Sequence, residues 1–170
     1  MVRVLKPVEL IVVASEKGRV TVKYPYQEPL VTSDFRGAIR IDASKCIGCG
    51  ACVKACPPNA LELLESPDRL VIRYFVGRCI FCWRCVDVCP VKAVVGTREF
   101  ELATDRVEDL FNYTVHRRAE CRECGSGFAT RRMVEYVTEK SAVSEYYANE
   151  CPECRKAKVL KAAARRRGGV

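Results

Sequence analysis

The run CIFCWRCVDVCP, residues 79–90, repeats the cysteine pattern of CIGCGACVKACP, residues 46–57. The two runs are offset by 33 positions, and their four cysteines and final proline match one by one. At the same offset, Val53 matches Val86. Two copies of a cysteine loop, a short helix and a strand indicate an internal duplication. The repeat therefore predicts an α+β core with pseudo-twofold symmetry.

Each run has the spacing that holds a [4Fe-4S] cubane. Three cysteines at C-x2-C-x2-C spacing lie on one tight turn and match three corners of a cube. The fourth cysteine lies before the proline on a short helix and reaches the neighbouring cluster, as the spacing of bacterial two-cluster ferredoxins requires. We therefore predict crossed ligands, with zinc ions or inert buried thiols as the alternative. Cluster 1 is assigned to Cys46, Cys49, Cys52 and Cys89, and cluster 2 to Cys79, Cys82, Cys85 and Cys56.

A second cysteine pattern, Cys121-x2-Cys124 and Cys151-x2-Cys154, follows in the C-terminal part. Four thiolates from two such knuckles form a tetrahedral shell that suits zinc or a single iron ion. Zinc is preferred on its frequency in such sites, because the spacing does not separate the two metals. The knuckles lack a three-cysteine loop, which disfavours a third cubane. Basic residues surround this site in the sequence and are expected to offset its negative charge: Arg117, Arg118, Arg122, Arg131, Arg132, Arg155 and Lys156.

The cysteine content, 12 in 170 residues, indicates metal binding when it occurs in clusters with x2 spacing. The longest apolar run, Leu10 to Ala14, is too short for a membrane span. The N-terminus also lacks the pattern of a secretory signal. We therefore expect a chain in the reducing cytoplasm, where thiols persist as metal ligands. A disulfide-stapled secreted domain is the alternative.

The formal net charge of +8 suggests nucleic-acid binding, but it counts every thiol as neutral. Metal binding removes the thiol protons. Twelve thiolates offset by two cubanes and one divalent ion would leave the metal-loaded protein with roughly +2. The basic excess therefore largely balances the metal sites, and we expect no nucleic acid among the partners.

The chain is expected to have four parts. Residues 1–38 form an N-terminal arm that docks on partner subunits, and residues 39–103 form the ferredoxin domain with two [4Fe-4S] clusters. Residues 104–157 form a helical extension with the four-cysteine knuckle. Residues 158–170 form a basic tail, which we expect to be solvated or disordered.

Local patterns predict the elements of these parts. Residues 1–24 fit either a strand pair around Gly18 or a short amphipathic segment. Pro25 and Pro29 predict extended or turn backbone, and Gly37 permits a turn.

Further along, strands are predicted at residues 39–41, 61–65 and 70–75, with a turn between the last two. Capping and acidic residues predict a short helix at 104–113. Met133, Val134, Tyr136 and Val137 recur at helical spacing and are interpreted as ordinary core packing.

The two cysteine runs differ where Gly48 and Gly50 are replaced by Phe81 and Trp83. Aromatic side chains would place apolar bulk near cluster 2, and a drier site disfavours the charge that reduction adds. Cluster 2 is therefore expected to have the lower reduction potential. The alternative is that the aromatic residues fill the core or contact a partner.

The sequence offers no nucleophilic or acid–base constellation beside the cysteines. His116 is the only histidine, and it is expected at the surface or in the core. Ligation of a metal by His116 near Cys121 is the alternative. We therefore expect no catalytic residues and no small-molecule substrate, and the chemistry of the chain is electron transfer.

The chain resembles the ferredoxin-type subunit of formate hydrogenlyase and related membrane-bound nickel–iron hydrogenases, which is similar to chain I of respiratory complex I. The resemblance covers roughly residues 20 to 160. The motifs that carry it are Tyr24-Pro25, Glu28-Pro29, Phe35-Arg36-Gly37, CIGCGACVKACPPNAL, GRCIFCWRCVDVCP and the CRECG and CPEC knuckles.

This resemblance implies that the eight cubane cysteines carry over position by position. It also implies a peripheral subunit at the cytoplasmic face of a membrane complex. The subunit would pass electrons from an iron–sulfur donor subunit or ferredoxin to the hydrogenase small subunit. The N-terminus departs from the family because it lacks a long amphipathic helix, so membrane contact is expected to be peripheral or made through partners.

Two rival functions stand beside the complex-bound relay. A free, diffusing ferredoxin would need neither the arm nor the knuckles. A zinc-knuckle nucleic-acid-binding protein would need aromatic and basic residues arranged for bases and phosphates, and the tail offers only charge.

Overall fold

A computed structural model describes residues 7–19, 21–141 and 145–167. The chain divides into two compact units, Met1–Phe35 and Arg36–Val170. The described helices include none that is both long and apolar enough to cross a membrane.

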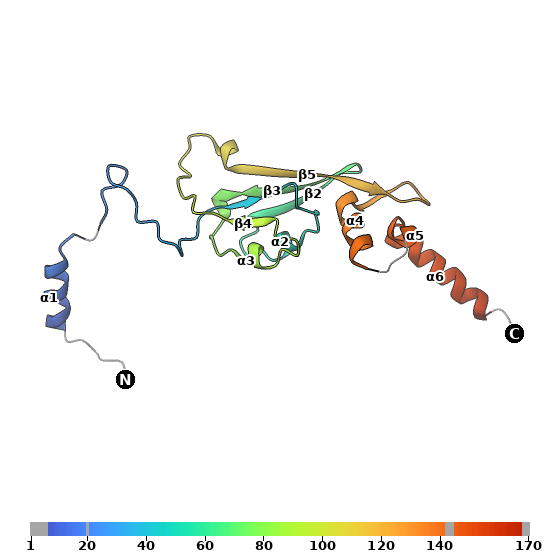
Figure 1. The fold of residues 1–170 in the computed structure, drawn as a ribbon, viewed down its shortest axis with the longest axis horizontal. Helices are drawn as coiled ribbons and strands as arrows, with labels where there is room; N and C mark the ends of the chain where they lie inside the picture. The colour runs from blue at the N-terminus through green and yellow to red at the C-terminus, as the bar shows by residue number, and fades with distance from the viewer. Residues whose placement is uncertain (1–6, 20, 142–144, 168–170) are drawn as a thin grey trace. The chain divides into compact units, whose positions relative to one another are not determined.

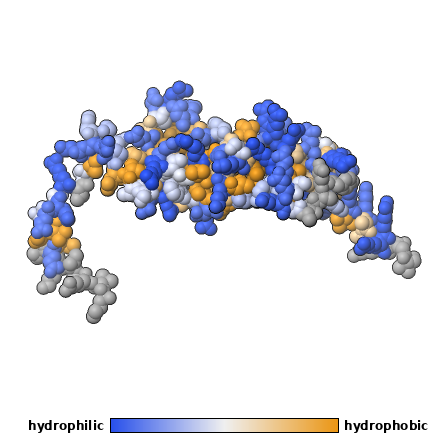
Figure 2. All heavy atoms as spheres, viewed as in Figure 1, coloured by the Kyte–Doolittle hydropathy of each residue, from blue (hydrophilic) through white to orange (hydrophobic). Residues whose placement is uncertain are grey.

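The first unit carries helix α1, Pro7–Lys17. The helix ends at Gly18, whose φ of +59° favours glycine. The predicted strand pair around Gly18 is therefore wrong, and the segment is a short helix. Four consecutive apolar side chains, Leu10–Val13, are at least half exposed and form a patch on this helix (Figure 2).

The arm after α1 turns and then extends, as its prolines predicted. The Gln27 amide donates to the Lys23 carbonyl at 2.9 Å across a turn that contains a cis Tyr24–Pro25 bond. Tyr26 and Leu30 are among the most exposed apolar side chains of the described chain.

The second unit begins with a two-stranded antiparallel pair, β1 (Ile39–Ile41) and β4 (Val94–Gly96). Between them, short helices follow the two cysteine loops, α2 at Ala51–Lys54 and α3 at Arg84–Asp87. A 3-10 turn, η1, precedes the second loop at Val76–Arg78. The predicted strand at residues 39–41 is confirmed.

A four-stranded antiparallel sheet forms the other layer, in the order β2-β3-β5-β6. Strands β2 (Leu61–Glu65) and β3 (Arg69–Phe75) confirm the predicted hairpin, and the Ser66 amide donates to the Arg69 carbonyl across its turn. Strands β5 (Phe111–Glu120) and β6 (Gly127–Thr130) continue the sheet. In Figure 1, α2 and α3 lie together on one side of this sheet.

Strand β5 was not predicted. The expected helix at residues 104–113 is only one 3-10 turn, η2 (Val107–Leu110), before the strand begins. Within β5, Thr114 and His116 are buried while Val115 is exposed, which is the period-two pattern of a half-buried strand. Since β5 pairs with β3 from Phe111 to Arg117, the C-terminal extension shares the sheet of the ferredoxin part.

Three helices complete the second unit: α4 (Arg131–Lys140), α5 (Glu145–Ala148) and α6 (Pro152–Arg167). Thr130 caps α4 by accepting the Met133 amide at 3.1 Å. The predicted apolar stripe of α4 is only partly buried, so it packs at the margin of the core.

The basic tail is exposed, as expected, but it is helical through most of its length. Residues 158–167 continue α6, and residues 168–170 lie outside the described chain. Alanine, lysine and arginine have high helix propensity, which explains why this segment is a helix and not a disordered end.

The core lies between the sheet and the cysteine loops. Ala60, Leu61, Ile72, Tyr74 and Ala93 are almost fully buried there, and the cysteines of both loops lie against them. A core of this size leaves much of the stabilisation to bound metal clusters.

Gly37 is needed for a close approach of two backbone segments, which corrects the expectation of a turn. A Cβ at Gly37 would lie 2.4 Å from the Glu99 carbonyl oxygen and 2.7 Å from the Arg98 carbonyl carbon. The Gly37 and Ala38 amides donate to Thr97 and Glu99 at 2.8 Å. The backbone ladder between these segments therefore leaves no room for a side chain.

Gly37→Ala is expected to destabilise the loaded protein by about 3 kcal/mol, because overpacking against backbone cannot be relieved by rotamer changes. Anaerobic denaturant unfolding would measure the change. Gly18→Ala is the comparison: no atom lies within 4 Å of its added methyl group, so only its left-handed backbone is strained, at a cost of about 1 kcal/mol. An unfolding midpoint for Gly37→Ala equal to that of Gly18→Ala would contradict the prediction.

Candidate metal centres

The two cysteine loops repeat each other in backbone conformation as well as in sequence. Residues with positive φ occur in pairs at the 33-residue offset: Gly48 and Phe81, Gly50 and Trp83, and Asn59 and Lys92. The aromatic members hold the left-handed conformation at a cost of about 1 kcal/mol each, which the glycines of the first loop avoid.

The fourth cysteine of each run also has the same hydrogen bond. The Ala60 amide donates to Cys56 Sγ at 3.2 Å, and the Ala93 amide donates to Cys89 Sγ at the same distance. Amide donors to sulfur stabilise a thiolate. Cys56 and Cys89 are therefore held in equivalent places by equivalent backbone.

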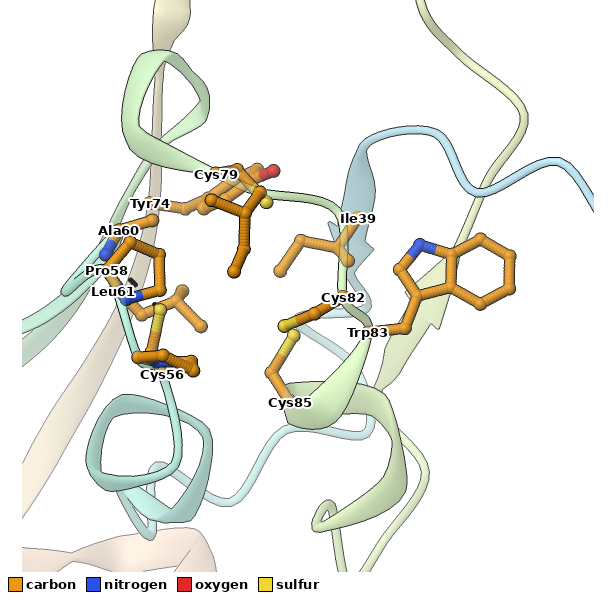
Figure 3. Close-up of a pocket in the computed structure, with 12 residues that line it drawn as sticks. Ile39, Cys56, Pro58, Ala60, Leu61, Tyr74, Cys79, Cys82, Trp83 and Cys85 are labelled. Carbon is orange, nitrogen blue, oxygen red and sulfur yellow. Dashed lines mark hydrogen bonds between the residues drawn. The ribbon is translucent and has the colours of Figure 1, made fainter.

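The sulfur atoms predicted for cluster 2 meet at one cavity. Cys56 from the first run lines it together with Cys79, Cys82 and Cys85 from the second (Figure 3). The pKa of Cys85 is raised to about 11, first by burial and then by the neighbouring Cys79 and Cys56 thiols. Without a metal, this apolar cavity disfavours thiolates, and a bound cation would reverse that preference.

The cysteines predicted for cluster 1 are likewise neighbours. The pKa of Cys46 is raised, first by burial, with the Cys49 and Cys89 thiols contributing. The pKa of Cys52 is raised to about 12 by burial, followed by the Cys46 and Cys49 thiols. The Cys89 thiol of the second run is thus a neighbour of Cys46 in the first loop.

The loop that leads into the first cysteine run is braced by residues after β5. Thr130 Oγ1 donates to the Ile47 carbonyl. Arg132 donates from one guanidinium nitrogen to the carbonyls of Ala43, Ser44 and Cys46. This cation was expected beside the knuckles, and the structure places it at the first cysteine loop instead.

Arg118 also lies away from the knuckles. Its guanidinium donates to the Ser66 carbonyl at 3.1 Å and forms an ion pair with Glu65 at 3.3 Å. Lys158, which the sequence did not single out, lies close to the knuckles and pairs with Glu123 and the fully buried Glu150. Positive charge near the four C-terminal cysteines therefore comes partly from Lys158, which was not among the predicted basic residues.

Trp83 holds the second cysteine loop to the segment that contains Gly37. Its indole Nε1 donates to the Gly37 carbonyl at 3.0 Å, and its ring covers Gly96 so closely that a Cβ there would lie 2.4 Å away. Arg36 stacks over the ring and donates to the Cys82 carbonyl at 3.0 Å. The ring points away from the Cys82 and Cys85 sulfurs (Figure 3), so its effect on the potential stays a prediction.

The four C-terminal cysteines come together as one site. The sulfurs of Cys121, Cys124, Cys151 and Cys154 all lie within 4.8 Å of one another, and Cys124 and Cys151 are 3.7 Å apart. A tetrahedral ion with metal–sulfur bonds of about 2.3 Å has sulfur–sulfur edges of about 3.8 Å. The spacing therefore fits a single metal ion.

Backbone amides favour the thiolate of Cys121, whereas the neighbouring Cys151 and Cys124 thiols raise the pKa of Cys154 to about 12. The Cys151 amide donates to Cys121 Sγ at 3.2 Å and, with other amides, lowers the pKa of Cys121 to about 6. Gly125 has a φ of +73°, which a knuckle turn requires, and Pro152 is the first residue of α6. His116 is not part of the site; it is buried in the core.

The fold and these cysteine sets define an iron–sulfur protein. A family model described as a 4Fe-4S dicluster domain matches residues 38–90. Formate hydrogenlyase subunit 6 of Escherichia coli (strain K12) is 36% identical over 153 residues, covering 84% of this chain and 85% of that protein. The chain therefore belongs to the family of formate hydrogenlyase subunit 6, and it is an electron-transfer iron–sulfur protein that binds [4Fe-4S] clusters.

Shorter matches link the cysteine region to other oxidoreductases. Subunit I of the F(420)H(2) dehydrogenase of Methanosarcina mazei is 39% identical over 64 residues, 38% of this chain and 36% of that protein. Chloroplastic NAD(P)H-quinone oxidoreductase subunit I of Adiantum capillus-veneris is 48% identical over 40 residues, 24% of each chain. A chain of an archaeal membrane-bound sulfane sulfur reductase matches with a TM-score of 0.45 and 25% identity, over 84% of this chain and 72% of that chain.

Proposed function

We propose that the chain relays electrons through two [4Fe-4S] clusters as a subunit of a membrane-bound, formate hydrogenlyase-type hydrogenase complex. The observation that carries this proposal is the meeting of Cys56 with Cys79, Cys82 and Cys85 around one cavity (Figure 3). The place of Cys56, a cysteine of the first run, beside the second loop supports an exchange of ligands between two clusters. When bound, each cluster accepts and releases single electrons.

The proposed ligands follow the crossed pattern and give the core an approximate twofold symmetry. Cluster 1 would be held by Cys46, Cys49, Cys52 and Cys89, and cluster 2 by Cys79, Cys82, Cys85 and Cys56. The equivalent amide bonds to Cys56 and Cys89 support this symmetry. The chain itself supplies the ligands, a dry setting and amide donors to sulfur.

The C-terminal site is proposed to hold one structural zinc ion on Cys121, Cys124, Cys151 and Cys154, with a single iron ion as the alternative. Both metals form tetrahedral sites with thiolates, so the sulfur spacing suits either. The four parts proposed from the sequence, residues 1–38, 39–103, 104–157 and 158–170, would then be arm, two-cluster domain, metal-knuckle extension and basic tail.

The proposed partners are other subunits of a complex like those to which the relatives belong, and the exposed N-terminal unit offers surface to contact them. The complex would contain a donor, either an iron–sulfur subunit or a ferredoxin, and a hydrogenase small subunit as acceptor. It would lie at the cytoplasmic face of the membrane. The apolar patch Leu10–Val13 and the exposed Tyr26 and Leu30 offer contact area for other subunits.

Metal and sulfide analysis of anaerobically purified protein tests this proposal. We expect about eight iron and eight sulfide per chain, with one zinc. Electron paramagnetic resonance on reduction should show two clusters. Zinc at all sites and a colourless protein would contradict the relay. Purification as a stable monomer, without hydrogenase subunits, would favour a free ferredoxin.

A further inference from the structure

The inner face of the sheet presents three buried polar side chains along one line, those of Tyr74, Thr114 and His116. In the register of β3 with β5, Leu70 faces His116 and Ile72 faces Thr114. Side chains of paired residues lie on the same face, and alternate residues share a face. Tyr74 on β3 therefore lies on the same face as His116 on β5.

Along the strands, Tyr74 and the Leu70–His116 pair are separated by four residues, or about 13 Å. The two side chains are 1% and 5% exposed, respectively. They therefore stand at opposite ends of the face that packs on the cysteine loops.

Tyr74 reaches the site of cluster 2. It lines the same cavity as Cys56, Cys79, Cys82 and Cys85. Its hydroxyl lies beside the Cys79 thiol (Figure 3). Within the described chain this hydroxyl forms no hydrogen bond of normal geometry, although the Cys79 thiol and the Ile39 backbone lie close enough to shift its pKa. A buried hydroxyl without a partner costs about 1–3 kcal/mol, so an acceptor is expected there in the loaded protein.

His116 reaches the loop of cluster 1. A Cβ at Gly48 would lie 3.1 Å from His116 Cδ2 and 3.2 Å from its Cγ, so the imidazole edge touches this glycine. Gly48 lies between the predicted ligands Cys46 and Cys49. The Nε2 atom of His116, which is bonded to Cδ2, has no hydrogen-bond partner within the described chain. Of the five buried side-chain polar atoms that lack a partner within the described chain, one therefore lies at each cysteine loop.

We propose that Tyr74 and His116 are positioning residues that set the reduction potentials of the two clusters. The Tyr74 hydroxyl donates a hydrogen bond to the Cys79 sulfur of cluster 2, and His116 Nε2–H donates to a sulfur of cluster 1. This inference rests on the ligand sets proposed above. Hydrogen bonds to cluster sulfur stabilise the more negative, reduced state and raise the potential.

Potentiometric titration followed by electron paramagnetic resonance tests each residue separately. Tyr74→Phe removes only the hydroxyl and should lower the potential of cluster 2. The expected shift is about 59 mV, which corresponds to a roughly tenfold change in the equilibrium constant of one-electron reduction. The potential of cluster 1 should stay unchanged. His116→Leu should lower only the potential of cluster 1, and His116→Gln, which keeps an N–H donor, should restore most of it.

Each variant is the control for the other, because both lie on one sheet face at different cysteine loops. Cys56→Ala and Cys89→Ala identify which signal belongs to which cluster. If Tyr74→Phe leaves both potentials unchanged while Cys56→Ala removes cluster 2, the inference fails and the proposed function stands. Equal shifts of both clusters would also overturn it, because they indicate a general structural change. Cys56→Ala and Tyr74→Phe should act on the same cluster. If Cys56→Ala removes one cluster and Tyr74→Phe shifts the potential of the other, the ligand assignment fails as well.

Discussion

Cys56→Ala is expected to remove cluster 2 while cluster 1 remains, although Cys56 belongs to the first cysteine run. Iron content should fall from about eight to about four per chain. The physical reason is that Cys56 lies with Cys79, Cys82 and Cys85 around one cavity. The first loop keeps its own three cysteines and the Cys89 thiol that neighbours Cys46.

The mirror substitution, Cys89→Ala, is the matched control and should remove cluster 1 instead. Both cysteines accept an amide hydrogen bond at 3.2 Å, so the two changes perturb equivalent local structure. Iron and sulfide analysis with electron paramagnetic resonance of reduced samples would measure both. Loss of cluster 1 alone in Cys56→Ala would show that each run serves its own cluster, contrary to the crossed arrangement.

Loss of the C-terminal metal is expected to loosen cluster 1 before cluster 2. Cys151→Ala removes one of the four sulfurs that surround this site. Structural zinc in small domains contributes an apparent binding free energy of about 10–16 kcal/mol, so the knuckles should open without it. The segment between them contains Thr130 and Arg132, whose hydrogen bonds hold the loop at residues 43–47.

Hydrogen bonds from a charged donor are worth about 1.5–3 kcal/mol. Their loss should therefore speed iron release from cluster 1 by roughly tenfold or more. Chelator-driven iron release, followed separately for the two clusters, measures the effect. Arg132→Met is the control because it removes the guanidinium bonds to the loop and leaves Thr130 and the four knuckle cysteines in place. It should reproduce the faster release with the C-terminal metal retained. Equal release rates from both clusters in Cys151→Ala would exclude this coupling.

The C-terminal extension shows where local patterns fail. Residues 104–113 carry capping and acidic residues that favour a helix, and only one 3-10 turn forms. The following strand pairs with β3, and this long-range pairing outweighs local propensity. Burial alternates along the strand, but Thr114 and His116 are buried and Val115 is exposed, so hydrophobic patterning offered no signal for this strand. Arg132 could not be placed from sequence, because its carbonyl partners lie more than 80 positions away.

The cysteine spacing by itself determined the class of the protein. Ligands two or three residues apart are brought together by a tight turn and a short helix, so local chain geometry is enough to predict cluster binding. Only the tertiary structure decided what surrounds those ligands. His116 and Arg132 come from a strand and a helix more than 60 positions after the first cysteine loop, and strand register and packing bring them to it. Tyr74 is near Cys79 in sequence, but the burial of its side chain beside the cysteines depends on how the sheet packs. Such contacts depend on how whole elements pair and pack, which no local spacing encodes.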